Sequence, residues 1–287
     1  MTAPVLINGL SAVADRYDVL LSDIWGVIHN GRESFKPACD ALARWRAERG
    51  PVILISNAPR PSSAVHSQLD QLGVPREAWS AFISSGDATR ILLSGRAPGP
   101  AWAIGPEKDA ALYEGLDLTF AGPDKAAFIS CTGPYDDDVE GPDDYAERFE
   151  VALARKLPMI CANPDIVVQK GDRLIYCGGA LAQRYEQMGG EVIMAGKPHA
   201  PIYGLCLGEA QVLLGRPLDP SRVLCIGDGI ATDAKGANDQ GLDMLFVASG
   251  IHGAETIGPA GIDATAVESL LAKDGARATY AIADLAW

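Results

Sequence analysis

The chain has 287 residues, of which 48% are hydrophobic, and its formal net charge is −13. That length accommodates one large domain or two ordinary ones. The acidic balance argues against binding to nucleic acid or to anionic membranes, because both need basic surfaces. It does not exclude an anionic ligand, since a metal ion and one lysine can reverse the potential inside a pocket.

The first fifteen residues lack a basic start followed by a continuous apolar stretch, and no apolar run is long enough to span a bilayer. None of the six cysteines forms a C-x-x-C pair, and most lie in apolar runs. We therefore predict a cytoplasmic protein with buried free thiols rather than disulfides or a zinc site.

The first predicted element is an apolar strand over residues 18–22, which delivers Asp23 and then a glycine turn in the run Leu-Leu-Ser-Asp-Ile-Trp-Gly-Val. In open α/β sheets, ligands bind at the carboxyl ends of the strands. A carboxylate there can attack phosphorus and form an aspartyl-phosphate. An aspartate that only caps a turn has the same local sequence.

A helical pattern over residues 37–48 leads to a second predicted strand, 52–55, which is followed by Ser56 and Asn57. A hydroxyl and neighbouring backbone N–H groups can hold the oxygens of a phosphate. Serine and asparagine also form ordinary turns after strands, so this motif has weight only in combination with others. A further helical pattern covers residues 62–72.

The middle of the chain repeats the alternation of short apolar runs and amphipathic stretches on its own. Strands are expected at 102–104, 126–131, 159–162 and 166–168, and a helix is expected over 143–156. Turn-forming glycines mark both edges, Gly86 and the pair Gly189-Gly190. We predict that residues 86–189 form an inserted α/β domain, because the motifs on either side of it belong to one site.

A predicted strand over residues 192–195 ends in Gly196-Lys197-Pro198, and a helical pattern over 201–214 follows it. A lysine at a strand end can neutralise charge on both a nucleophile and a phosphate. Most lysines are simply solvated, so this residue too gains weight only from its neighbours in the fold.

The most specific motif follows the predicted strand 223–226, which ends in Gly227-Asp228, with Asp233 five residues later at the start of a helix. Mg²⁺ requires hard oxygen ligands in octahedral geometry and usually keeps several waters. One aspartate can bind such an ion directly, while the other holds a bound water or the lysine. Two aspartates that cap turns are the alternative interpretation.

A last strand over 244–248 and a helix over 265–271 complete the alternation, which predicts an α/β protein with a doubly wound parallel sheet. Residues 1–85 and 190–287 would form this core, and 86–189 the insertion. A parallel sheet would bring the four strand ends to one edge. Their side chains would then supply a nucleophile, a hydroxyl, a cation and a metal site, which are the parts of a phosphoryl-transfer centre.

With these motifs the chain resembles the haloacid dehalogenase (HAD) superfamily of phosphatases, and most of all its NagD-like, p-nitrophenylphosphatase-type subgroup with a large α/β cap. The resemblance covers essentially the whole chain. It implies that Asp23 is the nucleophile, Ser56 the phosphate-binding hydroxyl and Lys197 the motif lysine. Residues 86–189 would be the cap.

The resemblance also implies a Mg²⁺ site made by Asp23, Asp228 and the backbone carbonyl of Trp25, with Asp233 just beyond the direct ligands. The run Asn163-Pro164-Asp165 is similar to a cap motif of the subgroup. The residues expected to contact the substrate or its phosphate are therefore Ser56, Asn57, Lys197, Asn163 and Asp165.

One position departs from the family pattern. The family motif is Asp-x-Asp-Gly, whose second aspartate is the general acid/base, and here that place holds Trp25. A positioned acid/base is typically worth ~10²–10⁴-fold in rate, and an indole N–H does not titrate usefully. The enzyme could be slow, His29 could act instead, or the protein could bind phosphate without turnover.

The expected reaction is hydrolysis of a small phosphorylated metabolite, and transfer to another acceptor than water is a third reading. Sugar phosphates, nucleotides, pyridoxal phosphate and glycerol phosphates all stay open as substrates, because no local motif encodes the contacts of the cap. A homodimer formed through the cap would suit the subgroup.

Overall fold

The computed structural model describes residues 3–170, 173–259 and 261–287, and the chain separates into two compact units. Unit 1 contains the residues up to Ser56, Val65–Ile83 and Lys197–Trp287, and unit 2 contains Asn57–Ala64 and Ser84–Gly196. The chain therefore passes between the units at four points, after residues 56, 64, 83 and 196.

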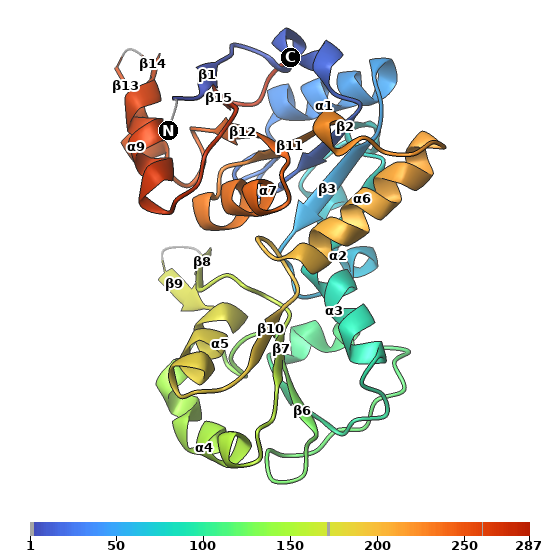
Figure 1. Cartoon of the computed structure of the whole chain (residues 1–287), viewed down its shortest axis with the longest axis vertical. Coiled ribbons are helices and arrows are strands. Elements are labelled where there is room, and N and C mark those ends of the chain that lie inside the picture. Colours follow the sequence, from blue (N-terminus) through green and yellow to red (C-terminus); the bar gives the residue numbers. More distant parts are fainter. Residues whose placement is uncertain (1–2, 171–172, 260) are drawn as a thin grey trace. The chain divides into compact units, whose positions relative to one another are not determined.

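A seven-stranded sheet forms the centre of unit 1, in the order β1-β15-β12-β11-β2-β3-β4, and helices flank it (Figure 1). Its inner strands β2, β3 and β11 are buried along their whole length and pair in parallel. Strands buried on both faces are typical of parallel sheets with helical cover, so the predicted fold class is confirmed. The strands are β1 (Val5–Leu6), β2 (Val19–Ser22), β3 (Val52–Ser56), β4 (Ala81–Ser84), β11 (Val223–Gly227), β12 (Asp243–Val247) and β15 (Tyr280–Ile282).

The predicted helices of this part of the chain are confirmed to within a few residues. They are α1 (Lys36–Glu48), α2 (Ser62–Gln71), α6 (Ala200–Leu214) and α9 (Ala264–Lys273). A helix was also predicted near Asp233, and there the π-helical turn Ile230–Ala234 leads into α7 (Lys235–Asp239). The short helix α8 (Gly253–Thr256) was not predicted, because it is too short to show a helical period in the sequence.

The strand order reverses at β2. From β2 the chain runs to one side through β3 and β4, whereas β11, β12 and β15 lie on the other side. At such a switch point a crevice opens outside the carboxyl ends of the two strands on either side of it. Asp23 follows β2 and Asp228 follows β11, so both aspartates lie at this place.

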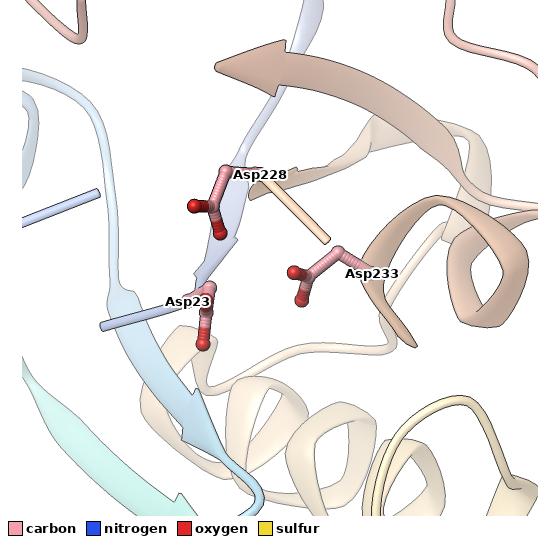
Figure 2. A group of neighbouring side chains, drawn as sticks. All are labelled: Asp23, Asp228 and Asp233. Carbon is pink, nitrogen blue, oxygen red and sulfur yellow. The ribbon is translucent and has the colours of Figure 1, made fainter. Parts of the chain in front are cut away.

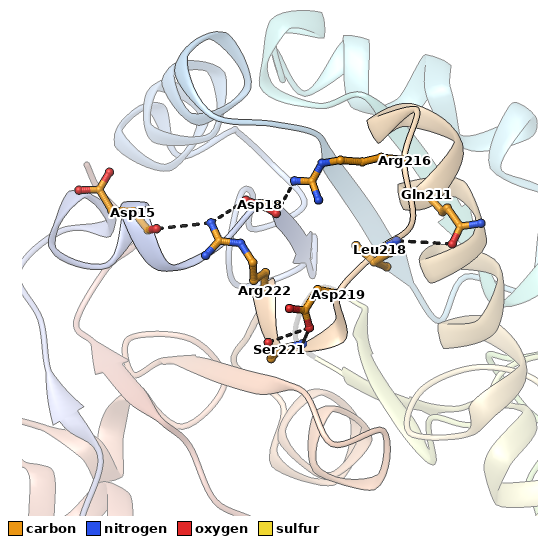
Figure 3. A network of polar contacts seen from close by, with 8 residues as sticks. All are labelled: Asp15, Asp18, Gln211, Arg216, Leu218, Asp219, Ser221 and Arg222. Carbon is orange, nitrogen blue, oxygen red and sulfur yellow. Dashed lines mark hydrogen bonds and ion pairs between the residues drawn. The ribbon is translucent and has the colours of Figure 1, made fainter.

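A polar network fastens the amino ends of the same two strands (Figure 3). The carboxylate of Asp18, just before β2, accepts hydrogen bonds from Arg222 at 2.7 Å and Arg216 at 2.5 Å. The hydrogen bond from Arg222 is the main cause that lowers the pKa of Asp18 to about 2. Because Arg222 directly precedes β11, this ion pair ties β2 to β11 at the end of the sheet away from Asp23 and Asp228.

Unit 2 has its own four-stranded parallel sheet, in the order β10-β7-β6-β5. The ring of Phe149 packs against the rings of Trp102, Tyr145 and Tyr185, with centroid separations of 6.0, 5.8 and 5.1 Å. Its elements are α3 (Ser85–Ser94), β5 (Ala101–Ile104), β6 (Phe128–Cys131), α4 (Ala146–Ala154), β7 (Met159–Cys161), β8 (Val167–Lys170), β9 (Arg173–Tyr176), α5 (Gly178–Gln187) and β10 (Val192–Met194).

One expectation about this part of the chain was wrong. The strand near 192–195 does not join the sheet of unit 1, because β10 pairs with β7. The strand predicted at 166–168 corresponds to β8, which forms a separate antiparallel hairpin with β9. The helix predicted over 143–156 is confirmed to within a few residues, as a 3₁₀ turn, Pro142–Tyr145, that leads into α4. An apolar run predicts a strand but not the partner with which it pairs.

All six cysteines are free and buried, as predicted from their apolar surroundings. Among the described residues, no helix is both long enough and apolar enough to cross a membrane.

Candidate active site

Three aspartates converge at the carboxyl edge of the sheet in unit 1 (Figure 2). Each of Asp23, Asp228 and Asp233 offers a carboxylate oxygen, and these oxygens lie within 4.8 Å of one another. Their exposed fractions are only 8%, 6% and 4%. The cluster is therefore a compact, largely dehydrated set of hard oxygen atoms.

The pairing of β2 with β11 sets the first two aspartates side by side. Ile226 lies opposite Ser22 in the register, and the backbone N–H of Asp23 donates to the carbonyl of Ile226 at 2.8 Å. Asp233 lies in the short π-helical turn Ile230–Ala234, and its Oδ2 accepts a hydrogen bond from the backbone N–H of Gly229 at 3.0 Å. The five-residue spacing in the sequence thus becomes one turn of chain around the site.

Lys197 is buried between two of these carboxylates. Its Nζ lies 2.6 Å from Oδ1 of Asp23 and 2.7 Å from Oδ1 of Asp233. Burial alone would lower the pKa of this amine, but Asp23 and Asp233 outweigh it and raise the pKa above the ordinary value. The ammonium is therefore charged, and it reaches both aspartates although its chain segment does not follow a strand of their sheet.

Burial also disfavours the ionised form of the carboxylates. It is the main cause that raises the pKa of Asp23, with Lys197 opposing the rise and Asp228 adding to it. The pKa of Asp228 is raised by burial and then by Asp233. Burial and Asp23 raise the pKa of Asp233 to about 7. Three carboxylates beside one ammonium leave two negative charges when all four groups are ionised.

Close backbone contacts hold Asp228 in place, and sequence reasoning missed them. The backbone N–H of Ile251 donates to Oδ2 of Asp228 at 2.7 Å. A Cβ on Gly26 or on Gly250 would lie 2.0 Å from the same oxygen, so neither position has room for a side chain. Gly26 also has a φ of +75°, which favours glycine. The only sequence signal for Gly250 is its place shortly after the end of β12.

The remaining predicted residues fall into two groups. Ser56 is the last residue of β3 and is buried. Asn57, Asn163 and Asp165 lie in unit 2, where the side-chain amide of Asn57 donates to Oδ1 of Asp165 at 2.9 Å. Oδ1 of Asn163 accepts a hydrogen bond from the backbone N–H of Asp165 at 3.2 Å. The structure thus brings Asn57 and Asp165 together in unit 2, and Asp23, Lys197, Asp228 and Asp233 together in unit 1.

Trp25 lies two residues after Asp23 and is 46% exposed. Its ring packs edge-on against the ring of His29 at 4.9 Å, and a Cβ on Gly31 would lie 2.3 Å from the indole. Nδ1 of His29 accepts a hydrogen bond from the backbone N–H of Gly31 at 3.0 Å. This contact places the ring proton of the neutral imidazole on Nε2.

The same surroundings make His29 a poor proton donor. Its side chain is buried, and burial lowers its pKa from 6.5 to about 4. At neutral pH the imidazole is therefore uncharged, and a neutral imidazole gives up its remaining proton only at far higher pH. This geometry argues against the acid/base role considered for His29.

Two family models match the chain. The first is described as haloacid dehalogenase-like hydrolase and matches residues 20–119, and the second is described as HAD-hydrolase-like and matches residues 194–273. Asp23 and Ser56 lie in the first match, and Lys197, Asp228 and Asp233 lie in the second.

The chain is 44% identical to a haloacid dehalogenase-like hydrolase from Brucella suis 1330 with a solved crystal structure, over 98% of this chain and 100% of that one, with a TM-score of 0.85. It shares the fold of a 4-nitrophenylphosphatase from Thermotoga maritima, with a TM-score of 0.70 and 17% identity over 95% of this chain and 96% of that one.

Curated relatives are more distant in sequence. A 5′-nucleotidase from Bacillus subtilis is 26% identical over 242 residues, which cover 82% of this chain and 88% of that protein. A glycerol-3-phosphate phosphatase from Gallus gallus is 27% identical over 271 residues, which cover 86% of this chain and 84% of that protein.

Proposed function

The chain belongs to the haloacid dehalogenase-like hydrolase family, as its motifs predicted, and we propose that it is a Mg²⁺-dependent phosphatase of small phosphate monoesters that uses Asp23 as its nucleophile. We propose further that unit 1 is the catalytic core and unit 2 the cap. The 5′-nucleotidase and the glycerol-3-phosphate phosphatase among the relatives support a small phosphorylated substrate.

One observation carries this proposal. The ammonium of Lys197 bridges Asp23 and Asp233, while Asp228 completes a group of three carboxylates within 4.8 Å. A nucleophile, a fixed cation and a set of hard oxygen ligands therefore share one buried space. Phosphoryl transfer needs these parts, because positioning and charge neutralisation do most of the work in that reaction.

The donor set suits Mg²⁺. All the candidate ligand atoms are carboxylate or carbonyl oxygens, which this ion prefers, and a divalent cation would offset the two negative charges left after Lys197. Asp23, Asp228 and the backbone carbonyl of Trp25 would hold the ion. Both oxygens of Asp233 are engaged by Lys197 and by Gly229, so Asp233 fits the place of a residue beyond the direct ligands. When bound, Mg²⁺ supplies positive charge against the phosphate oxygens.

The residues of the chain then have distinct tasks. An oxygen of Asp23 attacks phosphorus, and the bond between phosphorus and the ester oxygen breaks. The ester oxygen keeps the electron pair of that bond, takes a proton from water and leaves as an alcohol. Lys197 offsets negative charge on the attacking and transferred groups, and the hydroxyl of Ser56 donates to a phosphate oxygen. Water next attacks phosphorus and releases a proton to the solvent. The bond from Asp23 to phosphorus breaks, its electron pair returns to the Asp23 carboxylate, and inorganic phosphate leaves.

The proposal also covers the compartment and the assembly of the protein. The six buried thiols without disulfides are typical of a reducing compartment, which we propose is the cytoplasm. The proposed homodimer follows from the family resemblance, and sedimentation of the purified protein would test it.

The proposal is tested by a panel of phosphate monoesters, including nucleoside monophosphates, glycerol phosphate, sugar phosphates and 4-nitrophenyl phosphate. We expect release of inorganic phosphate with Mg²⁺ and almost none with excess chelator. Addition of simple alcohols as acceptors separates hydrolysis from transfer, since transfer would produce new phosphate esters. Phosphate binding without release from any ester would overturn the enzymatic proposal.

The raised pKa values predict a pH-dependent effect of Mg²⁺ on stability. Between about pH 4 and pH 7 the folded site holds protons that the unfolded chain has already released, so its contribution to the free energy of unfolding falls as pH rises. Mg²⁺ competes with these protons. We therefore expect Mg²⁺ to raise the melting temperature more at pH 7.5 than at pH 5.5.

Thermal unfolding at both pH values, with Mg²⁺ or with chelator, checks this expectation. In Asp228→Asn we expect a more stable metal-free protein, because a buried charge is gone, and little response to Mg²⁺. Equal stabilisation by Mg²⁺ at both pH values and in Asp228→Asn would show that the ion binds elsewhere.

A further inference from the structure

Three of the four points at which the chain passes between the units meet in one small cluster inside unit 2. Asn57 follows the first crossing, Ser85 lies one residue beyond the third, and Gly196 precedes the fourth. We call these residues and Asp165 the crossing cluster. Ser56 and Lys197, two proposed catalytic residues, are each joined to it by a single peptide bond.

Gly196 shows how closely the crossings pack. A Cβ on Gly196 would lie 2.5 Å from Oδ1 of Asn57 and 2.6 Å from Oγ of Ser85. Real Cβ atoms do not approach other atoms so closely, so only glycine fits here without a shift of its neighbours. The three chain segments are thus in direct contact where they enter or leave unit 2.

A buried hydrogen bond fastens this contact to the rest of unit 2. The amide of Asn57, which is 7% exposed, donates to Oδ1 of Asp165 at 2.9 Å. The carbonyl of Asp165 accepts from the backbone N–H of Gly179 at 3.1 Å, and its own N–H donates to Oδ1 of Asn163. The backbone of Asp165 is therefore tied to the first turn of α5.

We infer that Asn57 and Asp165 are positioning residues, an inference that rests on the proposed function. Their hydrogen bond holds in place the chain segments that lead to Ser56 and Lys197, and so fixes the positions of these two residues relative to each other. The sequence predicted instead that Asn57 and Asp165 contact the substrate. Positioning and substrate binding would depend on different properties of the Asp165 side chain. Positioning requires an acceptor for the Asn57 amide, whereas binding of a substrate group would depend on the negative charge.

Asp165→Asn and Asp165→Ala separate these roles. Asparagine keeps a carbonyl acceptor and loses the charge, whereas alanine loses both and leaves the Asn57 amide buried without this acceptor. We expect Asp165→Asn to retain kcat within about 3-fold and Asp165→Ala to lower it about 10- to 100-fold, with KM little changed, since a small misplacement of catalytic groups has effects of that size.

A reciprocal exchange gives a second test. Asn57→Asp alone places two carboxylates in contact and should lower kcat as strongly as Asp165→Ala. Combination with Asp165→Asn restores a donor and an acceptor in reversed order, so kcat should recover at least in part. Asp138→Asn serves as the control, because it removes a carboxylate of unit 2 from an exposed ion pair with Arg173.

Hydrogen–deuterium exchange gives a readout that does not need turnover. In Asp165→Ala, amides in peptides covering 52–60 and 195–199 should exchange faster than in the wild type and in Asp165→Asn, while those of α1 stay unchanged. Equal exchange in all variants, or a matching rise of KM in both Asp165 variants, overturns the positioning role. Absence of phosphate release by the wild type would sink only the proposed phosphatase activity.

Discussion

Replacement of Asp23 by asparagine is expected to reduce phosphate release by about 10³-fold or more, because an amide oxygen is a far weaker nucleophile than a carboxylate. The exchange leaves the size of the side chain and its distance from Lys197 nearly unchanged. It also removes one buried negative charge, so the variant should be no less stable than the wild type. The loss should therefore appear in kcat and not in folding.

A trapping experiment distinguishes a nucleophile from a residue that only binds the metal. Acid quenching during turnover should leave a phosphoryl group on the wild-type peptide that contains Asp23, detectable by mass spectrometry, and none on Asp23→Asn. Asp40→Asn, the same exchange at an exposed aspartate of α1, controls for the chemistry of the substitution. A phosphorylated peptide from another part of the wild-type chain would refute the assignment of Asp23.

Trp25 is the position at which we expect a gain of function. Without an acid beside the leaving oxygen, the alcohol must depart with little help, so hydrolysis should depend steeply on the acidity of the leaving group. Trp25→Asp restores the residue type of the family motif. We expect it to raise kcat for alkyl phosphates such as glycerol phosphate by about 10²-fold, the lower part of the range for general acid catalysis.

The effect should be small for 4-nitrophenyl phosphate, whose leaving group needs no proton. Trp25→Asn is the matched control, because it removes the same indole and the same contact with His29 but cannot donate a proton at neutral pH. In a series of esters with leaving groups of graded pKa, the rate should depend less steeply on the leaving-group pKa in Trp25→Asp than in the wild type and in Trp25→Asn. An unchanged dependence in a well-folded Trp25→Asp would mean that another group already protonates the leaving oxygen.

Much of the candidate site follows from local sequence. Asp23 and Asp228 end apolar strands, and the carboxyl ends of neighbouring parallel strands meet at one edge, so their convergence was predictable. Asp233 was predictable too, because only a few residues of chain separate it from Asp228. The free thiols and the helices α1, α2, α6 and α9 also followed from composition and period.

Other features depended on contacts between distant segments. The strand before Lys197 was expected in the sheet of Asp23, yet β10 pairs with β7 in unit 2. Lys197 is the first residue after the chain passes from unit 2 back into unit 1, and it contacts Asp23 from there without following a strand of the same sheet. The pairing of Asn57 with Asp165, 108 positions apart, was equally absent from the local pattern.

The sequence by itself determined which residue types end the strands and thus which chemistry the protein can perform, because hydrophobic period and turn chemistry are properties of a few neighbouring residues. Tertiary structure alone decided that His29 is buried and neutral, that the backbone of Ile251 holds Asp228, and that Lys197 bridges two carboxylates. Burial and pairing depend on which distant segments fold against a residue, so the local sequence does not predict them. A backbone N–H is present in every residue except proline, so the sequence does not indicate which one will bind a side chain.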